Sequence, residues 1–188
     1  IYGVPIVVDD GSSDGTSELA ERAGAVVVRH ERNHGYDAAI NTGFKKAVRL
    51  GSEIIITLDA DGQHDPSVLE KFIDLIASSA DVVAGIRGRK QRFAEHLFAW
   101  YTRIRFGIED PLCGMKAYRR VVYEALGHFD SYESIGTELL IFAATRNYRL
   151  GQIPIDVRER KDEPRFGKSL LGNYKILRSI LLSIRHVR

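Results

Sequence analysis

Two carboxylates and an amide stand close together in residues 54–64, where an apolar run ends abruptly in polar side chains. Asp59 and Asp61 are separated by one residue, and Gln63 follows at the same spacing. Two carboxylates this close repel each other unless a cation lies between them, and such oxygen ligands suit Mg²⁺ or Mn²⁺. The spacing therefore predicts a divalent-metal site that could hold a diphosphate. A strand-to-loop turn, with Asp59 as cap and Asp61 in the bend, explains the tripeptide equally well.

A second apolar segment also ends in acids. Residues 4–9 are predicted to form a short buried strand that delivers Asp9 and Asp10 to the loop that follows. The aliphatic run that starts at Ile54 suits a strand covered on both faces, as strands of parallel sheets are. Because ligands of open α/β sheets bind outside the carboxyl ends of the strands, both pairs of aspartates are expected to face a substrate.

The elements that must position these residues alternate along the chain. Further strands are expected at 25–29 and 81–86, and helices at 14–22, 37–50 and from Pro66 to about Ile76. Strands and helices that alternate in this way predict βαβ units, and hence an α/β fold with a mainly parallel sheet flanked by helices. Beyond these units the sequence predicts helices at 93–106, 136–147 and 170–187, a strand after the loop that begins at Asp110, an edge strand at 150–158 and a polar loop at 161–168.

Length and composition narrow the class of protein. A chain of 188 residues is long enough for one well-buried domain and rather short for two. Its net charge of +2 gives no argument for binding nucleic acid. Its single cysteine, Cys113, excludes an internal disulfide and is expected to be a small buried side chain. Because we find neither a signal peptide nor a bilayer-spanning apolar segment, we expect a chain that is soluble or peripheral to a membrane.

Basic and apolar residues are distributed unevenly. In the helix expected at 170–187, basic residues flank an apolar stripe, which favours an anionic membrane surface. Packing on the domain or in a homodimer explains the same stripe about as well. Trp100 and Tyr101 are expected to lie in the core or against a neighbouring element, and Lys116, Arg119 and Arg120 to form a solvated face.

Six short motifs, taken together, resemble a known family. They are Val-Asp-Asp-Gly-Ser-Ser-Asp-Gly-Thr (8–16), Asn-x-Gly (41–43), Leu-Asp-Ala-Asp-Gly-Gln-His-Asp-Pro (58–66), Gly-x-Arg (85–87), Cys-Gly-Met-Lys-Ala-Tyr-Arg-Arg (113–120) and Arg-Phe-Gly-Lys-Ser (165–169). In this order they resemble the inverting family 2 glycosyltransferases of the GT-A fold. Within that family the chain is most similar to the polyprenyl-phosphate sugar synthases related to dolichyl-phosphate mannose synthase.

The resemblance implies roles for the donor-side residues. Asp9, or Asp10 beside it, would contact the base or ribose of a nucleotide-diphosphate sugar, and Asp59 would face the ribose or the diphosphate. Asp61, helped by Gln63, would hold the Mg²⁺ or Mn²⁺. These roles make chemical sense because a metal that bridges the phosphates neutralises the charge that develops as the glycosidic bond breaks.

The resemblance leaves two acceptors open. A lipid-phosphate acceptor is already ionised, so that branch needs cations to position it. These cations and the accompanying hydroxyl would come from Arg87, Arg92, Arg165, Lys168 and Ser169. A saccharide hydroxyl instead needs a carboxylate to take its proton, and Glu138 stands where that branch often has its base. The motif at 165–169 favours the polyprenyl phosphate, and with it a place on the cytoplasmic face of a membrane.

The chain departs from the family at its start. Family members normally begin with one more strand, which forms part of the nucleotide pocket, so we expect a strand and a helix to precede residue 1 of this single catalytic domain, 1–188. Two rivals remain. A sugar nucleotidyltransferase would need a glycine-rich basic loop that the sequence lacks, and an inactive binding module would not need Asp59, Asp61 and Gln63.

Overall fold

The computed structural model describes residues 3–88, 90, 92–158 and 170–186. Its strands are β1 (Ile6–Asp9), β2 (Val26–Arg29), β3 (Ile54–Thr57), β4 (Val82–Arg87), β5 (Lys116–Arg119) and β6 (Leu150–Ile155). Its α-helices are α1 (Thr16–Arg22), α2 (Tyr36–Arg49), α3 (Leu69–Ser78), α4 (Phe93–Phe106), α5 (Arg120–Leu126), α6 (Glu138–Thr145) and α7 (Leu170–His186), and a 3₁₀ turn, Pro66–Val68, precedes α3. The elements follow the order that the sequence predicts.

The strands form two sheets in the described part of the chain. β1 and β2 pair in parallel, and the other four strands are ordered β3-β5-β4-β6. β4 and β6 are parallel, whereas β5 is antiparallel to both β3 and β4. Strand directions are therefore mainly parallel, as predicted, with β5 as the exception. β3 differs from the expectation, because its pairing is antiparallel and it lies at an edge of its sheet.

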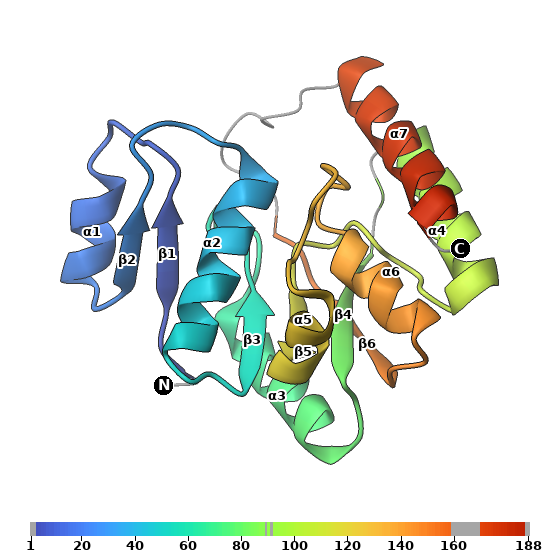
Figure 1. Cartoon of the computed structure of the whole chain (residues 1–188), viewed down its shortest axis with the longest axis horizontal. Coiled ribbons are helices and arrows are strands. Elements are labelled where there is room, and N and C mark those ends of the chain that lie inside the picture. The colour runs from blue at the N-terminus through green and yellow to red at the C-terminus, as the bar shows by residue number, and fades with distance from the viewer. Residues whose placement is uncertain (1–2, 89, 91, 159–169, 187–188) are drawn as a thin grey trace.

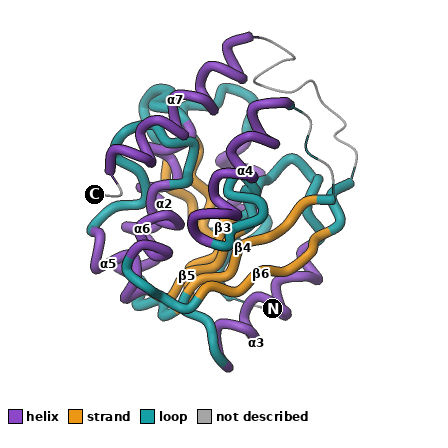
Figure 2. The backbone as a smooth tube through the Cα atoms, turned by 90° about the vertical axis from the view of Figure 1, so that its right-hand side faces the viewer, coloured by secondary structure: helices purple, strands orange, loops and turns teal. Residues whose placement is uncertain are grey.

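Helices cover both faces of the sheets (Figures 1 and 2). α3 packs on β4, β5 and β6, while α2 packs on β1 and β3 and α5 packs on β5. Side chains alternate across a strand, so neighbouring residues enter different cores. Val82 and Tyr118 point toward α2, α5 and α6, and Val83 and Ala117 point toward α3. β1, β2 and β3 point the same way in Figure 1, so the loops that follow them lie at one edge.

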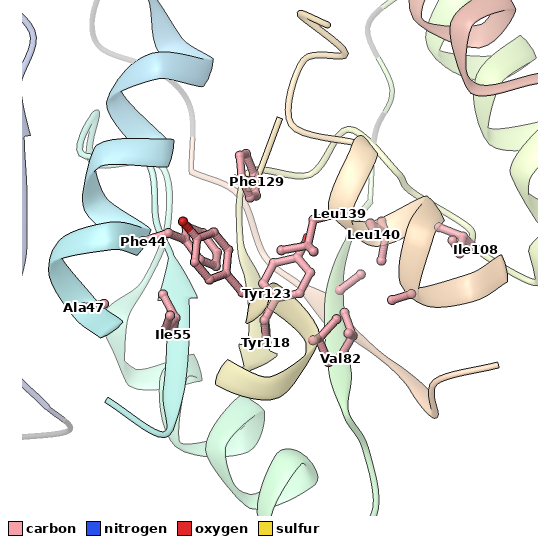
Figure 3. Close-up of a cluster of buried hydrophobic side chains, with 13 residues drawn as sticks. Phe44, Ala47, Ile55, Val82, Ile108, Tyr118, Tyr123, Phe129, Leu139 and Leu140 are labelled. Carbon is pink, nitrogen blue, oxygen red and sulfur yellow. The ribbon is translucent and has the colours of Figure 1, made fainter. Parts of the chain in front are cut away.

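The larger core lies between the sheet and α2, α5 and α6 (Figure 3). The Phe44 ring stacks on Tyr123 and Phe129, with 5.0 Å between ring centroids in each pair, and meets Tyr118 edge-on. This aromatic packing joins α2 to the chain segments on both sides of α5. It therefore supports the loop at 127–137, which borders the candidate site described below.

α4 and α7 pack against each other as a layer that contacts Ile141 of α6, whose other buried side chains belong to the larger core. Two large apolar side chains of α4 are exposed, while others on the same helix are buried. Phe93 is 80% exposed and Trp100 is 63% exposed, whereas Ala94 and Phe98 are buried. Trp100 therefore does not lie in the core, one of the two positions expected for it, whereas Tyr101 packs against the cluster that α4, α6 and α7 share. None of the helices described is long and apolar enough to cross a bilayer.

Candidate functional site

Asp59 leaves β3 and lies directly over Gly114, the residue that precedes the approach to β5. A Cβ atom at Gly114 would come within 2.7 Å of Asp59 Cγ and closer still to Oδ2, so only glycine leaves room for the carboxylate. Thr57 holds the two segments together by donating to the carbonyl of Gly114 at 2.6 Å. No hydrogen bond or ion pair between described residues occupies the Asp59 carboxylate.

Asp61 and Gln63 lie in the loop that follows Asp59. Asp61 Oδ1 accepts the backbone N–H of Gln63 at 3.1 Å. The side-chain amide of Gln63 donates to the carbonyl of Arg158 at 3.3 Å, and the N–H of Arg158 donates back to the carbonyl of Gln63. His64, buried, forms an isolated bridge to Val157. The aspartate loop is therefore joined to the segment that follows β6, and Gln63 turns its amide nitrogen to the protein.

The Asp9 carboxylate is hydrogen-bonded to residues that follow β1. Its carboxylate accepts the Ser12 N–H at 2.7 Å and the Ser17 hydroxyl, and Arg29 lies 4.0 Å away. Hydrogen bonds from Ser17 and then Ser12 lower the pKa of Asp9 to about 2. The side chain of Asp9 is 1% exposed, so this carboxylate holds the turn rather than facing solvent.

Asp10 is also surrounded by protein donors. Its carboxylate meets His30 Nδ1 at 2.7 Å and accepts the N–H groups of His34 and Gly35 at 2.9 and 2.7 Å. Burial alone would raise the pKa of Asp10, but these hydrogen bonds outweigh it and lower the pKa. An open hollow of about 430 Å³, lined by Gly11, Ser12, Arg29, His30 and Glu31, adjoins this loop. The loop after β2 is therefore fixed to the loop after β1 beside this hollow.

Arg87 ends β4 inside a cluster of charges. Its Nε and Nη2 donate to Asp110 at 2.7 and 2.9 Å, and Nη2 lies 3.3 Å from Glu95. Burial opposes the charge on the guanidinium, but Asp110 and then Glu95 outweigh it and raise the pKa of Arg87. Arg92, at the start of α4, lies 3.6 Å from the same Glu95. The carboxylates of Asp110 and Glu95 thus neutralise the two arginines that the sequence predicts to bind the acceptor phosphate.

The remaining predicted acceptor residues cannot be placed. Arg165, Lys168 and Ser169 lie outside the described residues. The chain before them is described as far as Arg158, which donates to Asp65 Oδ2 at 2.8 Å in addition to its contacts with Gln63. Arg158 therefore lies beside the aspartate loop.

Lys116 overturns a prediction. It does not lie on a solvated face, because its residue is 2% exposed, and Nζ donates to the carbonyl of Gly136 at 3.2 Å. Arg119 is half-buried and donates to the carbonyls of Ile76 and Ala80, at the end of α3. The prediction of a solvated face failed because β5 is a central strand, between β3 and β4. Lys116 therefore points into the interior, below the loop at 127–137.

Glu138 opens α6 and is held by the loop before it. Its carboxylate accepts the Ser131 N–H at 2.5 Å and the Ser131 hydroxyl at 3.0 Å, and lies 2.9 Å from His128 Nε2. Both oxygens therefore have protein partners. Its side chain is 12% exposed, so Glu138 fastens the loop and is poorly placed to take a proton from a substrate.

Asp37, in the first turn of α2, is a polar group that the sequence analysis missed. Burial and then the neighbouring Asp130 raise the pKa of Asp37 to about 7, and Oδ1 is buried with no hydrogen-bond partner in the described part of the chain. Burial and then the charge of Asp59 raise the pKa of Tyr36, the residue before it. Position 37 carries no motif, so only the folded structure reveals its setting.

The side-chain oxygens near the end of β3 suit a metal ion that the protein and a substrate bind together. No group of three or more His, Cys, Asp or Glu side chains in the described ranges could hold a metal ion. Mg²⁺ is usually bound through one or two carboxylates together with substrate phosphates and water, not by an all-protein cage. Asp59, Asp61 and the Gln63 oxygen match that pattern, because they offer oxygen ligands at the open edge of the sheet.

Comparison with known proteins decides the family. The model of glycosyl transferase family 2 matches residues 6–136. The chain belongs to this family. A dolichyl-phosphate hexose transferase of Haloferax volcanii is 35% identical over 170 residues, which cover 84% of this chain and 72% of that protein. An undecaprenyl-phosphate 4-deoxy-4-formamido-L-arabinose transferase of Pectobacterium carotovorum is 34% identical, covering 92% of this chain and 54% of that protein.

Solved structures confirm the fold. Glucosyl-3-phosphoglycerate synthase of Mycobacterium tuberculosis, crystallised with Mg²⁺ and uridine diphosphate, superposes with a TM-score of 0.76 at 22% identity. It covers 95% of this chain, which spans 67% of that protein. The same synthase was also crystallised with Mn²⁺ and UDP-glucose. The α/β fold of the family 2 glycosyltransferase described here is thus the GT-A type that the motifs predict.

Proposed function

We propose that this family 2 glycosyltransferase moves a sugar from a nucleotide-diphosphate sugar to a polyprenyl phosphate. An oxygen of the lipid phosphate attacks the anomeric carbon, the bond from that carbon to the donor β-phosphate oxygen breaks, and the nucleoside diphosphate leaves. Attack opposite to the leaving group inverts the anomeric centre. The names of the relatives from Haloferax volcanii and Pectobacterium carotovorum support this acceptor class.

The donor half of the proposal uses the edge at the end of β3. Asp61 and the Gln63 oxygen would hold Mg²⁺ or Mn²⁺, with Asp59 toward the ribose or diphosphate. Such a metal supplies charge neutralisation for the departing diphosphate. Asp9 and Asp10 would act mainly by fixing the loop whose backbone borders the nucleotide, because protein donors already surround their carboxylates.

The state of Glu138 supports a phosphate acceptor over a hydroxyl acceptor that would use Glu138 as its base. A hydroxyl acceptor needs a base, and both carboxylate oxygens of Glu138 are bonded to Ser131 and His128. A phosphate acceptor arrives ionised and needs no base, only cations. Arg92, Arg165 and Lys168 would supply these, with Ser169 as a hydroxyl donor. Arg87 would contribute by holding Asp110 in place and by neutralising part of the negative charge near Asp110.

The lipid substrate also explains the apolar surface of the α4–α7 layer. Phe93, Trp100 and Ile104 on α4 are 80%, 63% and 69% exposed, and Tyr174 and Leu181 on α7 are 65% and 63% exposed. Exposed aromatic and aliphatic side chains with arginines near them suit the boundary of an anionic bilayer. We propose that this surface rests on the membrane that carries the acceptor.

A second candidate keeps the fold and changes the acceptor to a saccharide hydroxyl. A general base works best when its pKa lies near the working pH, and the pKa of Asp37 is raised to about 7. Asp37 is therefore a second candidate base for this rival, beside Glu138. The rival predicts that Asp37→Asn abolishes transfer, whereas the phosphate acceptor predicts that it does not.

One assay separates the candidates. The purified chain is incubated with Mn²⁺, a panel of radiolabelled nucleotide sugars and either a polyprenyl phosphate in vesicles or soluble saccharides. We expect label to enter the lipid, Asp61→Asn to remove this transfer, and Glu138→Gln and Asp37→Asn to retain most of it. Label in a saccharide and none in the lipid would overturn the proposal, as would loss of lipid transfer in a folded Glu138→Gln variant.

A vesicle-flotation assay tests the membrane surface separately. Vesicles that contain anionic lipid should carry the chain to the top of a density gradient, and Trp100→Ser with Phe93→Ser should weaken this binding. The matched control is Val121→Ser on α5, which removes an apolar side chain that is 55% exposed outside the α4–α7 layer. Equal flotation of both variants would contradict the assignment of this surface.

A further inference from the structure

The loop that joins α5 to α6, residues 127–137, holds part of its backbone in an unfavourable conformation. Glu133 and Ile135 have φ angles of 57° and 59°, in the left-handed region that residues other than glycine rarely adopt. The cost is greatest for a β-branched residue such as Ile135. Such conformations persist only where surrounding contacts impose them, and they gather at functional sites. The contacts of this loop therefore indicate what its shape serves.

Asn41, from the Asn-x-Gly motif, attaches the start of the loop to α2. Its side-chain oxygen accepts the Phe129 N–H at 2.8 Å, and its amide nitrogen donates to the Asp130 carbonyl at 2.7 Å. The Asp130 carboxylate in turn accepts the N–H groups of Ser134 and Gly136 at 3.0 and 3.2 Å. Asn41 thus fixes one side of the loop to the helix that packs on β1 and β3.

The end of the loop is attached to the strands that carry the candidate site. Lys116, buried at the start of β5, donates from Nζ to the Gly136 carbonyl at 3.2 Å. Its backbone N–H donates to the hydroxyl of Thr57, the last residue of β3, at 3.2 Å. Asp59 follows Thr57 by two residues. Because a buried ammonium that loses its acceptor is destabilised, a displaced Gly136 carbonyl would disturb the ends of β3 and β5.

Two further contacts attach the outer side of the loop to the α4–α7 layer. The Arg178 guanidinium, on α7, donates to the Tyr132 carbonyl at 3.2 Å and lies 3.7 Å from the Glu133 carboxylate. Ile135 packs against the buried cluster that α4 and α7 share. The two residues with left-handed backbone, 133 and 135, are therefore residues that the α4–α7 layer contacts.

We propose that Arg178 is a positioning residue for the transfer reaction. By holding the backbone at Tyr132 and Glu133, it keeps the loop in the strained shape that presents the Gly136 carbonyl to Lys116. The proposal rests on the function proposed above. Without Arg178 the left-handed residues relax, and the loop no longer fixes the strand ends that border the donor. Arg178 thus joins the layer proposed to rest on the membrane to the site of transfer.

Amide hydrogen exchange, followed by mass spectrometry, measures the loop without requiring turnover. The N–H groups of Ser134 and Gly136 are bonded to Asp130, so peptides that cover residues 130–137 should exchange slowly in the wild type. Loss of a hydrogen bond from a charged donor should speed their exchange by about tenfold in Arg178→Gln. Arg178→Lys retains a charged donor and should exchange at nearly the wild-type rate.

Steady-state transfer measures the consequence for the reaction. A short-chain polyprenyl phosphate in detergent micelles serves as acceptor, so binding to vesicles does not enter the rate. We expect the kcat of Arg178→Gln to fall by about tenfold, because small misplacements near reacting groups are costly. KM for the donor should change little, since Arg178 touches none of the proposed donor ligands, and Arg178→Lys should recover most of the loss. A merely structural arginine would lower the melting temperature and leave kcat unchanged below it.

Arg185→Gln is the matched control. Arg185 is exposed on the same helix, and no hydrogen bond or ion pair in the described part of the chain joins it to the loop. The substitution removes the same charge from α7. It should therefore leave both the exchange of residues 130–137 and the kcat in micelles at their wild-type values.

The outcomes separate this inference from the proposed function. Wild-type exchange and kcat in Arg178→Gln, or equal changes in Arg185→Gln, overturn the positioning role and leave the proposed function standing. Faster exchange without a lower kcat, or the reverse, also overturns it. Failure of the wild type to transfer a sugar to any polyprenyl phosphate overturns the proposed function and this role with it. Faster exchange together with lower kcat, in Arg178→Gln alone, supports the inference.

Discussion

Two strands of this protein end in aspartates at the same edge of the fold, and the surroundings of Asp59 differ from those of Asp9 and Asp10. After β1, Asp9 and Asp10 accept hydrogen bonds from backbone and side-chain donors of their own and the adjacent loop. After β3, Asp59 lies over a glycine with no described partner. A carboxylate whose lone pairs are satisfied by protein stabilises a loop, and one without donors is available to a ligand.

The largest effect should come from a change at the proposed metal site. Asp61→Asn keeps the shape of the side chain and removes a charged oxygen ligand, so we expect transfer to fall by about a hundredfold or more. The melting temperature without ligands should change little. Steady-state transfer and thermal unfolding of the same sample measure both quantities, and retention of more than a tenth of the activity would contradict this role.

Gly114→Ala tests the space beneath Asp59. The new Cβ would overlap the carboxylate, and the side chain has to turn away because the backbone of β5 is fixed by Thr57. We expect donor binding to weaken by about tenfold, the effect of losing one or two hydrogen bonds to a charged group. Gly3→Ala, where a Cβ would meet nothing within 4 Å, is the control. Unchanged KM for the donor would show that Asp59 does not bind it.

Asp9→Asn should affect stability more than chemistry. The pKa of Asp9 is lowered to about 2 by Ser17 and Ser12, so its stabilising effect is present above the unfolded pKa near 4 and is lost as the pH falls to about 2. The variant should melt at a lower temperature than the wild type at pH 7, and the difference should shrink between pH 4 and pH 2. A variant with normal melting but no transfer would make Asp9 a ligand residue instead.

Asp37→Asn should give the smallest effect, and it should raise the free energy of unfolding instead of lowering it. Because the pKa of Asp37 is raised to about 7, the wild type loses stability as the pH rises from 4 to 7 and then stays level. The variant lacks this loss, so above pH 7 its free energy of unfolding should exceed that of the wild type by about 1–2 kcal/mol, after allowing for solvent screening. Urea unfolding at pH 5 and pH 8 measures the difference, which should be near zero below pH 4.

Local patterns were enough for much of the fold. The apolar spacing of α2 and α4, the turn at Pro66 and the edge position of β6 follow from residues that are near one another in sequence, and all four are present in the structure. Which side of α4 is buried did not follow, because Ala94 and Phe98 pack inward while the larger Phe93 and Trp100 remain exposed. A helical stripe indicates an apolar surface without telling what covers it.

The sequence by itself determined the family, through six motifs in a fixed order, and it determined that Asp59, Asp61 and Gln63 follow a strand. Only the tertiary structure decided which acids are already satisfied, that Lys116 is buried, and that Glu138 is bonded to Ser131 and His128. The reason is physical. Strand and turn formation depend on neighbours a few residues away, whereas the charge and availability of a side chain depend on donors that the fold brings from distant segments.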